Sequence, residues 1–199
     1  MMEKNSRSWR WMVPLITLAA LASAAISMSG CAPLIVGAAA TGVVVATDRR
    51  TTGAQLDDTT MSAAIVYKVN ERYGDKVHVN VTSYNGIVLL TGEVSDQAAM
   101  EGVVQIAEGE KRVRAVQNEL LIGPVSSLSS RANDSFITSK VKTRFIDSDF
   151  SPTHIKVVTE RGIVYLMGLV KRAEGEQATE IARKTSGVKR VVRIFEYND

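Results

Sequence analysis

The chain has 199 residues, which is enough for one large domain or two small ones. It carries 24 basic and 21 acidic side chains, one cysteine and two histidines, and its formal net charge is +3. A single cysteine excludes an intramolecular disulfide, and the lack of a Cys–His cluster in the sequence argues against structural zinc. The low aromatic content, 6%, weakens any case for stacking on nucleic acid, so no nucleic-acid partner is expected.

The N-terminal segment is typical of an export signal. Lys4, Arg7 and Arg10 precede an apolar run over residues 13–28, and small residues come just before Cys31. The apolar run is near the lower length limit for spanning a bilayer, so a retained transmembrane anchor is the alternative interpretation.

The four residues Met28-Ser29-Gly30-Cys31 resemble the lipobox of bacterial lipoproteins, with Met in place of the usual Leu. The resemblance implies cleavage before Cys31 and acylation of its thiol and of the new amine. One acyl chain binds a membrane only marginally, whereas the three chains of a lipoprotein would make attachment effectively permanent. Ala32 follows the cysteine, and the absence of Asp there implies sorting to the outer membrane, facing the periplasm.

The remainder of the chain contains an internal repeat with an offset of 76 residues. The segment HVNVTSYNGIVLLTGEV from His78 aligns with HIKVVTERGIVYLMGLV from His154, and DDTTMSAAIVYKVN from Asp57 aligns with NDSFITSKVKTRFI from Asn133. We therefore predict five segments: a signal peptide over 1–30, an acylated tether over 31–57, a first domain over 58–122, a Ser-rich linker over 123–132 and a second domain over 133–199.

Each copy begins with a helix and continues into two strands. In copy two, Ile137, Val141 and Phe145 recur every four residues and predict a helix with Asp134 as its N-cap. Two alternating strands follow, and in copy one they are joined by Asn85-Gly86, a hairpin signal because both residue types tolerate positive φ.

A second helix and a last strand complete each copy. The helix begins near Ser95 in copy one, and the strands run over residues 113–122 and 188–197. The order αββαβ predicts an α+β fold in which each copy forms a small three-stranded sheet with two helices on one face.

The segments GIVLLTG over residues 86–92 and GIVYLMG over residues 162–168 resemble the hairpin of the BON domain. A Gly-Val pair before the last strand, Gly187-Val188, adds to the resemblance in copy two, whereas copy one has Arg112-Val113 there. Two such units behind a lipobox resemble the dual-BON outer-membrane lipoproteins associated with envelope integrity and division. The resemblance implies a protein that binds phospholipid and supports the outer-membrane barrier, without a catalytic site.

Motifs for catalysis and metal binding are not found in the sequence. His78 and His154 occupy equivalent strand positions, but no cysteine or carboxylate cluster joins them in the sequence, so a structural role is favoured over a zinc pair. The serines of residues 126–130 have no identifiable base, and the hairpin glycines do not precede a helix as in a phosphate loop. We expect no enzyme, no metal site and no cofactor.

The two copies differ in charge. Residues 58–122 hold 6 basic and 9 acidic side chains, and residues 132–199 hold 12 basic and 9 acidic. Such a difference suggests different partners for the two copies. The more acidic first domain would suit a protein-interaction adaptor that docks on outer-membrane assembly or division proteins through its sheet face or edge.

The first helix of copy two points to an anionic phospholipid membrane as the partner. Phe136, Lys140 and Arg144 form a stripe beside the predicted buried one, and Lys142 adds a charge. The ring can enter the headgroup boundary while the cations stay with the phosphates. Packing of Phe136 on the core or on the first domain is the alternative. The predicted phospholipid-binding residues are therefore Phe136, Lys140, Lys142 and Arg144, whereas copy one has Thr60, Ala64 and Lys68 in the matching stripe.

Overall fold

The structure is a computed structural model, and it describes residues 48–199. The predicted signal peptide, Cys31 and most of the predicted tether lie outside the described residues. Within residues 48–199, none of the helices is both long and apolar enough to cross a membrane.

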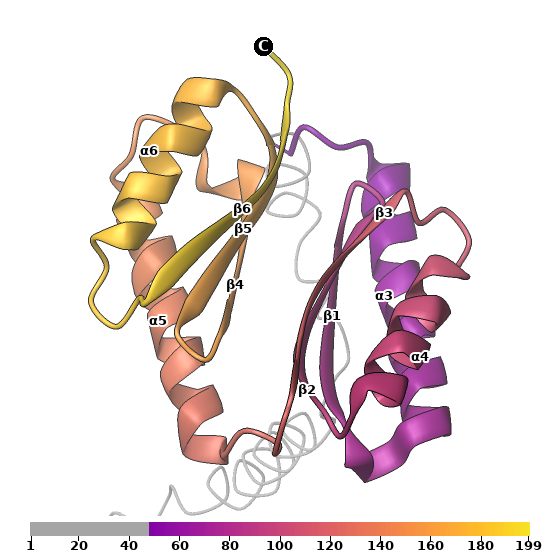
Figure 1. Ribbon diagram of the computed structural model, residues 1–199. Coiled ribbons are helices and arrows are strands. Elements are labelled where there is room, and N and C mark those ends of the chain that lie inside the picture. The colour runs from indigo at the N-terminus through magenta and orange to yellow at the C-terminus, as the bar shows by residue number, and fades with distance from the viewer. Residues whose placement is uncertain (1–47) are drawn as a thin grey trace, which may run out of the picture. The chain divides into compact units, whose positions relative to one another are not determined.

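The predicted element order αββαβ is confirmed in both repeats (Figure 1). The first repeat consists of α3 (Thr52–Tyr73), β1 (His78–Tyr84), β2 (Ile87–Val94), α4 (Gln97–Glu108) and β3 (Ala115–Ile122). The second consists of α5 (Leu128–Ile146), β4 (Ile155–Glu160), β5 (Ile163–Val170), α6 (Arg172–Arg183) and β6 (Arg190–Tyr197). Short 3-10 turns, η2 (Gly74–Lys76) and η3 (Pro152–His154), lead into β1 and β4.

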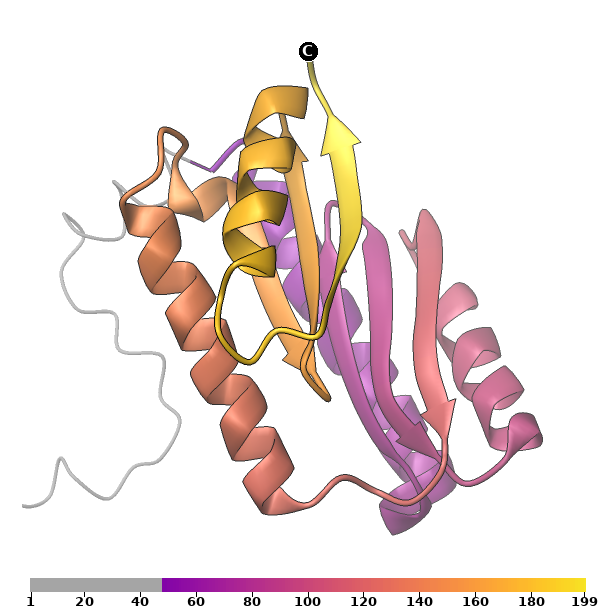
Figure 2. The ribbon, with the colours of Figure 1, turned by 60° about the vertical axis from the view of Figure 1, so that its left-hand side comes forward.

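Each repeat forms its own three-stranded sheet, in the orders β1-β2-β3 and β4-β5-β6. The central strand pairs antiparallel with the strand before it through the hairpin, and parallel with the last strand through the helical crossover. The two helices of each repeat cover one face of its sheet (Figures 1 and 2). That face carries the core, which in the first repeat includes Ile65, Val88, Leu90 and Val103, all fully buried. Each such side chain stabilises the fold by about 1.5–3 kcal/mol.

The predicted hairpin turn is confirmed and recurs in the second repeat. Asn85 and Gly86 have φ values of 49° and 78°, and Arg161 and Gly162 have 53° and 78°, so both residues of each two-residue turn are left-handed, as in a type I′ turn. Further along the hairpin, a Cβ on Gly92 would lie 1.9 Å from the carbonyl oxygen of His78, which explains the glycine there.

Both long helices begin earlier than the sequence predicts. α5 begins at Leu128, and its N-cap is Ser127, whose side chain accepts a hydrogen bond from the N–H of Ser130 (3.2 Å). The prediction that Asp134 caps this helix is therefore wrong, and the Ser-rich segment supplies its first turn. α3 likewise begins at Thr52 inside the predicted tether. Ser and Thr are strong N-caps, so each helix begins at its cap rather than where the apolar periodicity starts.

The helix-free faces of the two sheets pack against each other. Tyr84 and Leu89 from the first repeat and Tyr165 and Met167 from the second form a separate buried apolar cluster. The first sheet therefore uses this face for an intramolecular contact, and the adaptor hypothesis is left with the sheet edge.

Candidate functional site

The predicted stripe on α5 lies on the surface. Phe136 is 62% exposed, so it packs neither in the core nor against the first repeat. Lys140 and Arg144 follow at four-residue spacing, which places them along the same side of the helix. Leu128, 77% exposed, lies eight residues before Phe136 and about 80° away around the helix axis, so it is on the same helix but outside this stripe. It falls within the predicted linker, so the sequence did not indicate it as a helix residue. We call Phe136, Lys140 and Arg144 the α5 stripe.

The two cations of the α5 stripe are held by backbone carbonyl groups near the end of α6. The Lys140 ammonium lies 4.7 Å from the centre of the Phe136 ring and donates to the carbonyl of Ser186. Arg144 donates to the carbonyl of Lys184 (2.7 Å) and to Thr185 Oγ1 (3.3 Å). Within residues 48–199, neither cation forms an ion pair with a carboxylate. Both charges therefore remain available to an anion.

The contacts with the end of α6 bring the Lys184 backbone next to α5. Lys184 is 40 residues from Arg144 in the sequence, yet its backbone carbonyl accepts from the Arg144 guanidinium. The Lys184 side chain is 68% exposed, and within the described residues its ammonium pairs with Glu180 on α6 (3.2 Å). Sequence periodicity within one helix does not reveal such a neighbour.

Lys142 does not lie with the α5 stripe. It lies two positions after Lys140, which turns it about 200° around the helix axis. It lines a separate cavity of about 460 Å³ together with Arg50, Tyr84 and Lys156. Burial lowers the pKa of Lys156, whose ammonium donates to the carbonyl of Ser83 (3.3 Å). The structure therefore brings together three of the four predicted residues and places Lys142 elsewhere.

Two buried aspartates, equivalent in the repeat, join each first helix to its hairpin. Asp134 on α5 accepts from the backbone N–H groups of Arg161 and Gly162, both at 2.8 Å. Asp58 on α3 accepts in the same way from the hairpin of the first repeat, at 2.7 and 2.8 Å. Both residues are 4% exposed. Asp134 therefore holds the turn, and its two hydrogen bonds also fix α5 against the sheet. We call these two hydrogen bonds the Asp134 clasp.

The segment that leads from the predicted tether is bound to the domains. Arg49 makes two hydrogen bonds to the carboxylate of Glu174 (2.6 and 2.7 Å) and one to the carbonyl of Leu169 (3.0 Å). The hydrogen bonds from Arg49 hold the pKa of Glu174 below its ordinary value. Arg50 pairs with Asp58 (2.8 Å). A lipid at Cys31 would thus be separated from the docked Asp48 by 17 residues, which span at most about 60 Å.

Comparison with known proteins identifies the repeat. A family model described as the BON domain matches residues 57–124 and 133–199. The outer membrane lipoprotein DolP of Haemophilus influenzae is 39% identical over 189 residues, which cover 94% of this chain and 98% of that protein.

Two further relatives match over a smaller part of the chain. The 21 kDa hemolysin of Actinobacillus pleuropneumoniae is 31% identical over 75% of this chain and 79% of its own length. The osmotically-inducible protein Y of Escherichia coli is 30% identical over 68% of this chain and 70% of its own length. None of these three names denotes an enzyme. The chain belongs to the BON-domain family, within the group of two-BON outer-membrane lipoproteins that includes DolP.

Proposed function

We propose that this protein is held in the outer membrane by an acylated Cys31, faces the periplasm, and binds anionic phospholipid through the α5 stripe, thereby helping to maintain the outer-membrane barrier. The anchor and location are supported by the lipobox and by the similarity to an outer membrane lipoprotein along nearly the whole chain. The single observation that carries the lipid contact is the exposed ring of Phe136 with the Lys140 ammonium 4.7 Å from its centre.

The α5 stripe has an apolar half and a basic half. The Phe136 ring can enter the headgroup boundary, where burying it is worth about 1.5–3 kcal/mol. Lys140 and Arg144 each add about 1 kcal/mol near an anionic surface. A total of about 3.5–5 kcal/mol corresponds to a dissociation constant from about 3 mM to about 0.2 mM, before ordering costs. Such weak contact is sufficient because the tether keeps α5 near the membrane and raises the effective lipid concentration.

The first repeat lacks the same combination. Its matching residues are Thr60, Ala64 and Lys68, and the Lys68 ammonium pairs with Glu110 (2.6 Å), which neutralises its charge. Tyr67 on α3 is 68% exposed but has no such basic stripe beside it. It is therefore a matched control for Phe136.

The test is co-sedimentation of residues 47–199 with vesicles, since the described cores lie inside this range. Wild type is expected to bind phosphatidylglycerol vesicles, to bind phosphatidylcholine vesicles weakly, and to dissociate as salt is added. Phe136→Ala combined with Lys140→Glu should abolish binding. The control combines Tyr67→Ala with Lys111→Glu, at an exposed lysine in the turn after α4, and should bind as wild type does. Equal binding to both lipids, or equal effects of the two double variants, would contradict the proposal.

A protein-interaction adaptor is the second candidate, and one feature favours it. Strand β3 pairs only with β2 in the described residues, so one edge of the first sheet can accept an added strand. Its last residues, Leu121 and Ile122, are 44% and 52% exposed. A photo-crosslinker at Asn118 in cells should capture a protein if this candidate is correct. Capture of nothing there, together with lipid capture at position 136, would favour lipid binding alone.

A further inference from the structure

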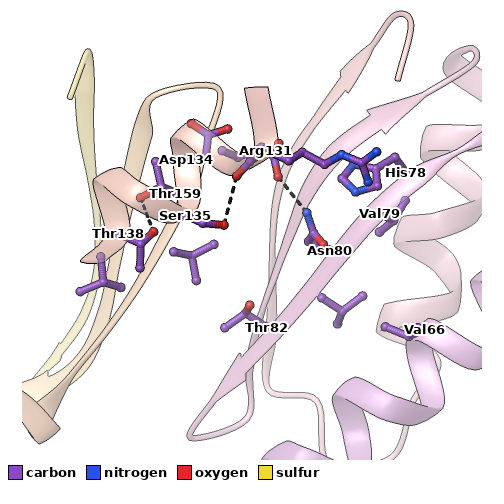
Figure 3. A pocket seen from close by; sticks show the side chains of 14 residues that line it. Val66, His78, Val79, Asn80, Thr82, Arg131, Asp134, Ser135, Thr138 and Thr159 are labelled. Atoms are coloured by element: carbon purple, nitrogen blue, oxygen red, sulfur yellow. Dashed lines mark hydrogen bonds between the residues drawn. The ribbon is translucent and has the colours of Figure 1, made fainter. Parts of the chain in front are cut away.

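Three side chains of metal-binding type meet where the two repeats pack together. His78 begins β1, Glu93 lies on β2, and Glu160 ends β4. One ligand atom of each lies within 4.8 Å of the others. The cluster adjoins a cavity of about 620 Å³ between the repeats, in which Figure 3 shows His78 and Asn80.

Both carboxylates are buried, and one oxygen of Glu160 has no hydrogen-bond partner. Glu93 is fully buried, and its oxygens accept from the N–H of Ser126 (3.1 Å) and from Arg161 (3.2 Å). Glu160 is 6% exposed. Its Oε2 accepts from the amide of Asn80 (2.8 Å), but its Oε1 is buried without a hydrogen-bond partner. An unpartnered buried carboxylate oxygen is costly unless something compensates it.

The His78 ring lies close enough to Glu93 for both side chains to bind one metal ion. His78 Nδ1 is buried and lies 3.3 Å from Glu93 Oε2, without the alignment of a hydrogen bond. Ligands at about 2.0–2.2 Å from a tetrahedral Zn²⁺ are separated by about 3.3–3.5 Å from each other. The spacing between His78 and Glu93 already matches this value, and a small movement of the Glu160 carboxylate would bring it into range.

Two arginines lie near the cluster, and within residues 48–199 neither forms an ion pair with Glu160. Arg131 lines the adjoining cavity, and Figure 3 shows its side chain beside His78. Arg161 balances Glu93, and its side chain is 46% exposed, so it can turn toward solvent. Glu160 has Asn80 as its partner, which carries no charge. Burial and the neighbouring Glu93 carboxylate raise the pKa of Glu160.

We propose that His78, Glu93 and Glu160 bind one divalent transition-metal ion, with Zn²⁺ as the best fit, and that this ion links the two BON domains. An imidazole with two carboxylates is a ligand set that suits zinc better than calcium or magnesium, which prefer oxygen alone. Water from the adjoining cavity can complete the coordination. Because His78 and Glu93 belong to the first repeat and Glu160 to the second, the bound ion stabilises their docking.

The test uses the full acylated chain in detergent micelles after treatment with a chelator. Calorimetric titration with Zn²⁺ should show one ion per chain, and Co²⁺ should give the visible absorption of a low-symmetry site. His78→Gln and Glu160→Gln should each weaken zinc binding by more than about 100-fold. Loss of a residue that only supports a ligand costs about 10- to 100-fold, and loss of a ligand itself should cost more. His154→Gln, at the equivalent position of the second repeat, should bind as wild type does.

Thermal unfolding provides the second readout. Zinc should raise the unfolding temperature of wild type and of His154→Gln, and should leave that of Glu160→Gln unchanged. Glu160→Gln is isosteric, and its side-chain carbonyl can still accept from Asn80, so it should fold without metal even if His78→Gln does not. Absence of zinc binding to wild type, or binding that survives Glu160→Gln, would overturn the proposal.

Discussion

Replacing Asp134 by Ala removes the clasp between α5 and the hairpin of the second BON domain. Two hydrogen bonds at 2.8 Å from Arg161 and Gly162 are lost. Hydrogen bonds to a charged group are worth about 1.5–3 kcal/mol each, and the desolvation of the buried carboxylate offsets part of this. Arg161 must also keep a φ of 53° without the acceptor that favours it. We expect Asp134→Ala to reduce the free energy of unfolding by about 3–5 kcal/mol, a large share of the stability of a typical domain.

Urea unfolding of residues 47–199 measures this cost. Asp134→Asn keeps one acceptor oxygen and should lose about half as much as Asp134→Ala. Asp147, exposed at the end of the same helix, is the matched control, and Asp147→Ala should change the free energy of unfolding by less than about 0.5 kcal/mol. A loss below about 1 kcal/mol for Asp134→Ala would refute the clasp.

Further predictions concern the contacts that join the repeats and the start of the described chain. Met167→Ala opens a cavity in the fully buried interface between the sheets and should cost about 2–5 kcal/mol in urea unfolding, whereas no change would contradict the apolar docking. Arg49→Ala should cost about 1–3 kcal/mol and should make residues 48–51 sensitive to limited proteolysis. The lowered pKa of Glu174 means that this pair stabilises the fold fully above the ordinary Glu value of 4.5 and loses its effect as the pH falls through the lower folded-state value. The difference between wild type and Arg49→Ala should therefore shrink on acidification below that range, and a constant difference would count against the pair.

Local chemistry made the repeated architecture predictable. Asn85-Gly86 marks its turn because both residues accept positive φ, and the repeat carries the same turn to Arg161-Gly162, where the residue types alone are a weaker signal. The helix ends were less predictable. The run around Ser127 has the composition of a linker, yet one good cap and packing further along the helix extend α5 through it.

The clasp and the buried cluster show what short-range patterns miss. Asp134 binds a turn 27 residues away, and only the matching position of Asp58 in the repeat hints at a shared role. His78 and Glu93 are paired across the hairpin, so counting back from the Asn85-Gly86 turn would have placed them opposite each other. Glu160 joins them only because the two repeats dock, and neither periodicity nor turn chemistry encodes that docking.

The most direct test of lipid binding is the mapping of amide chemical shifts by nuclear magnetic resonance in residues 47–199 as phosphatidylglycerol micelles are added. We predict that the largest changes fall on Phe136, Lys140 and Arg144, and that Tyr67 on the equivalent helix of the first repeat barely moves. Changes centred on Tyr67, with the α5 stripe unaffected, would contradict the assignment of lipid binding to the second BON domain.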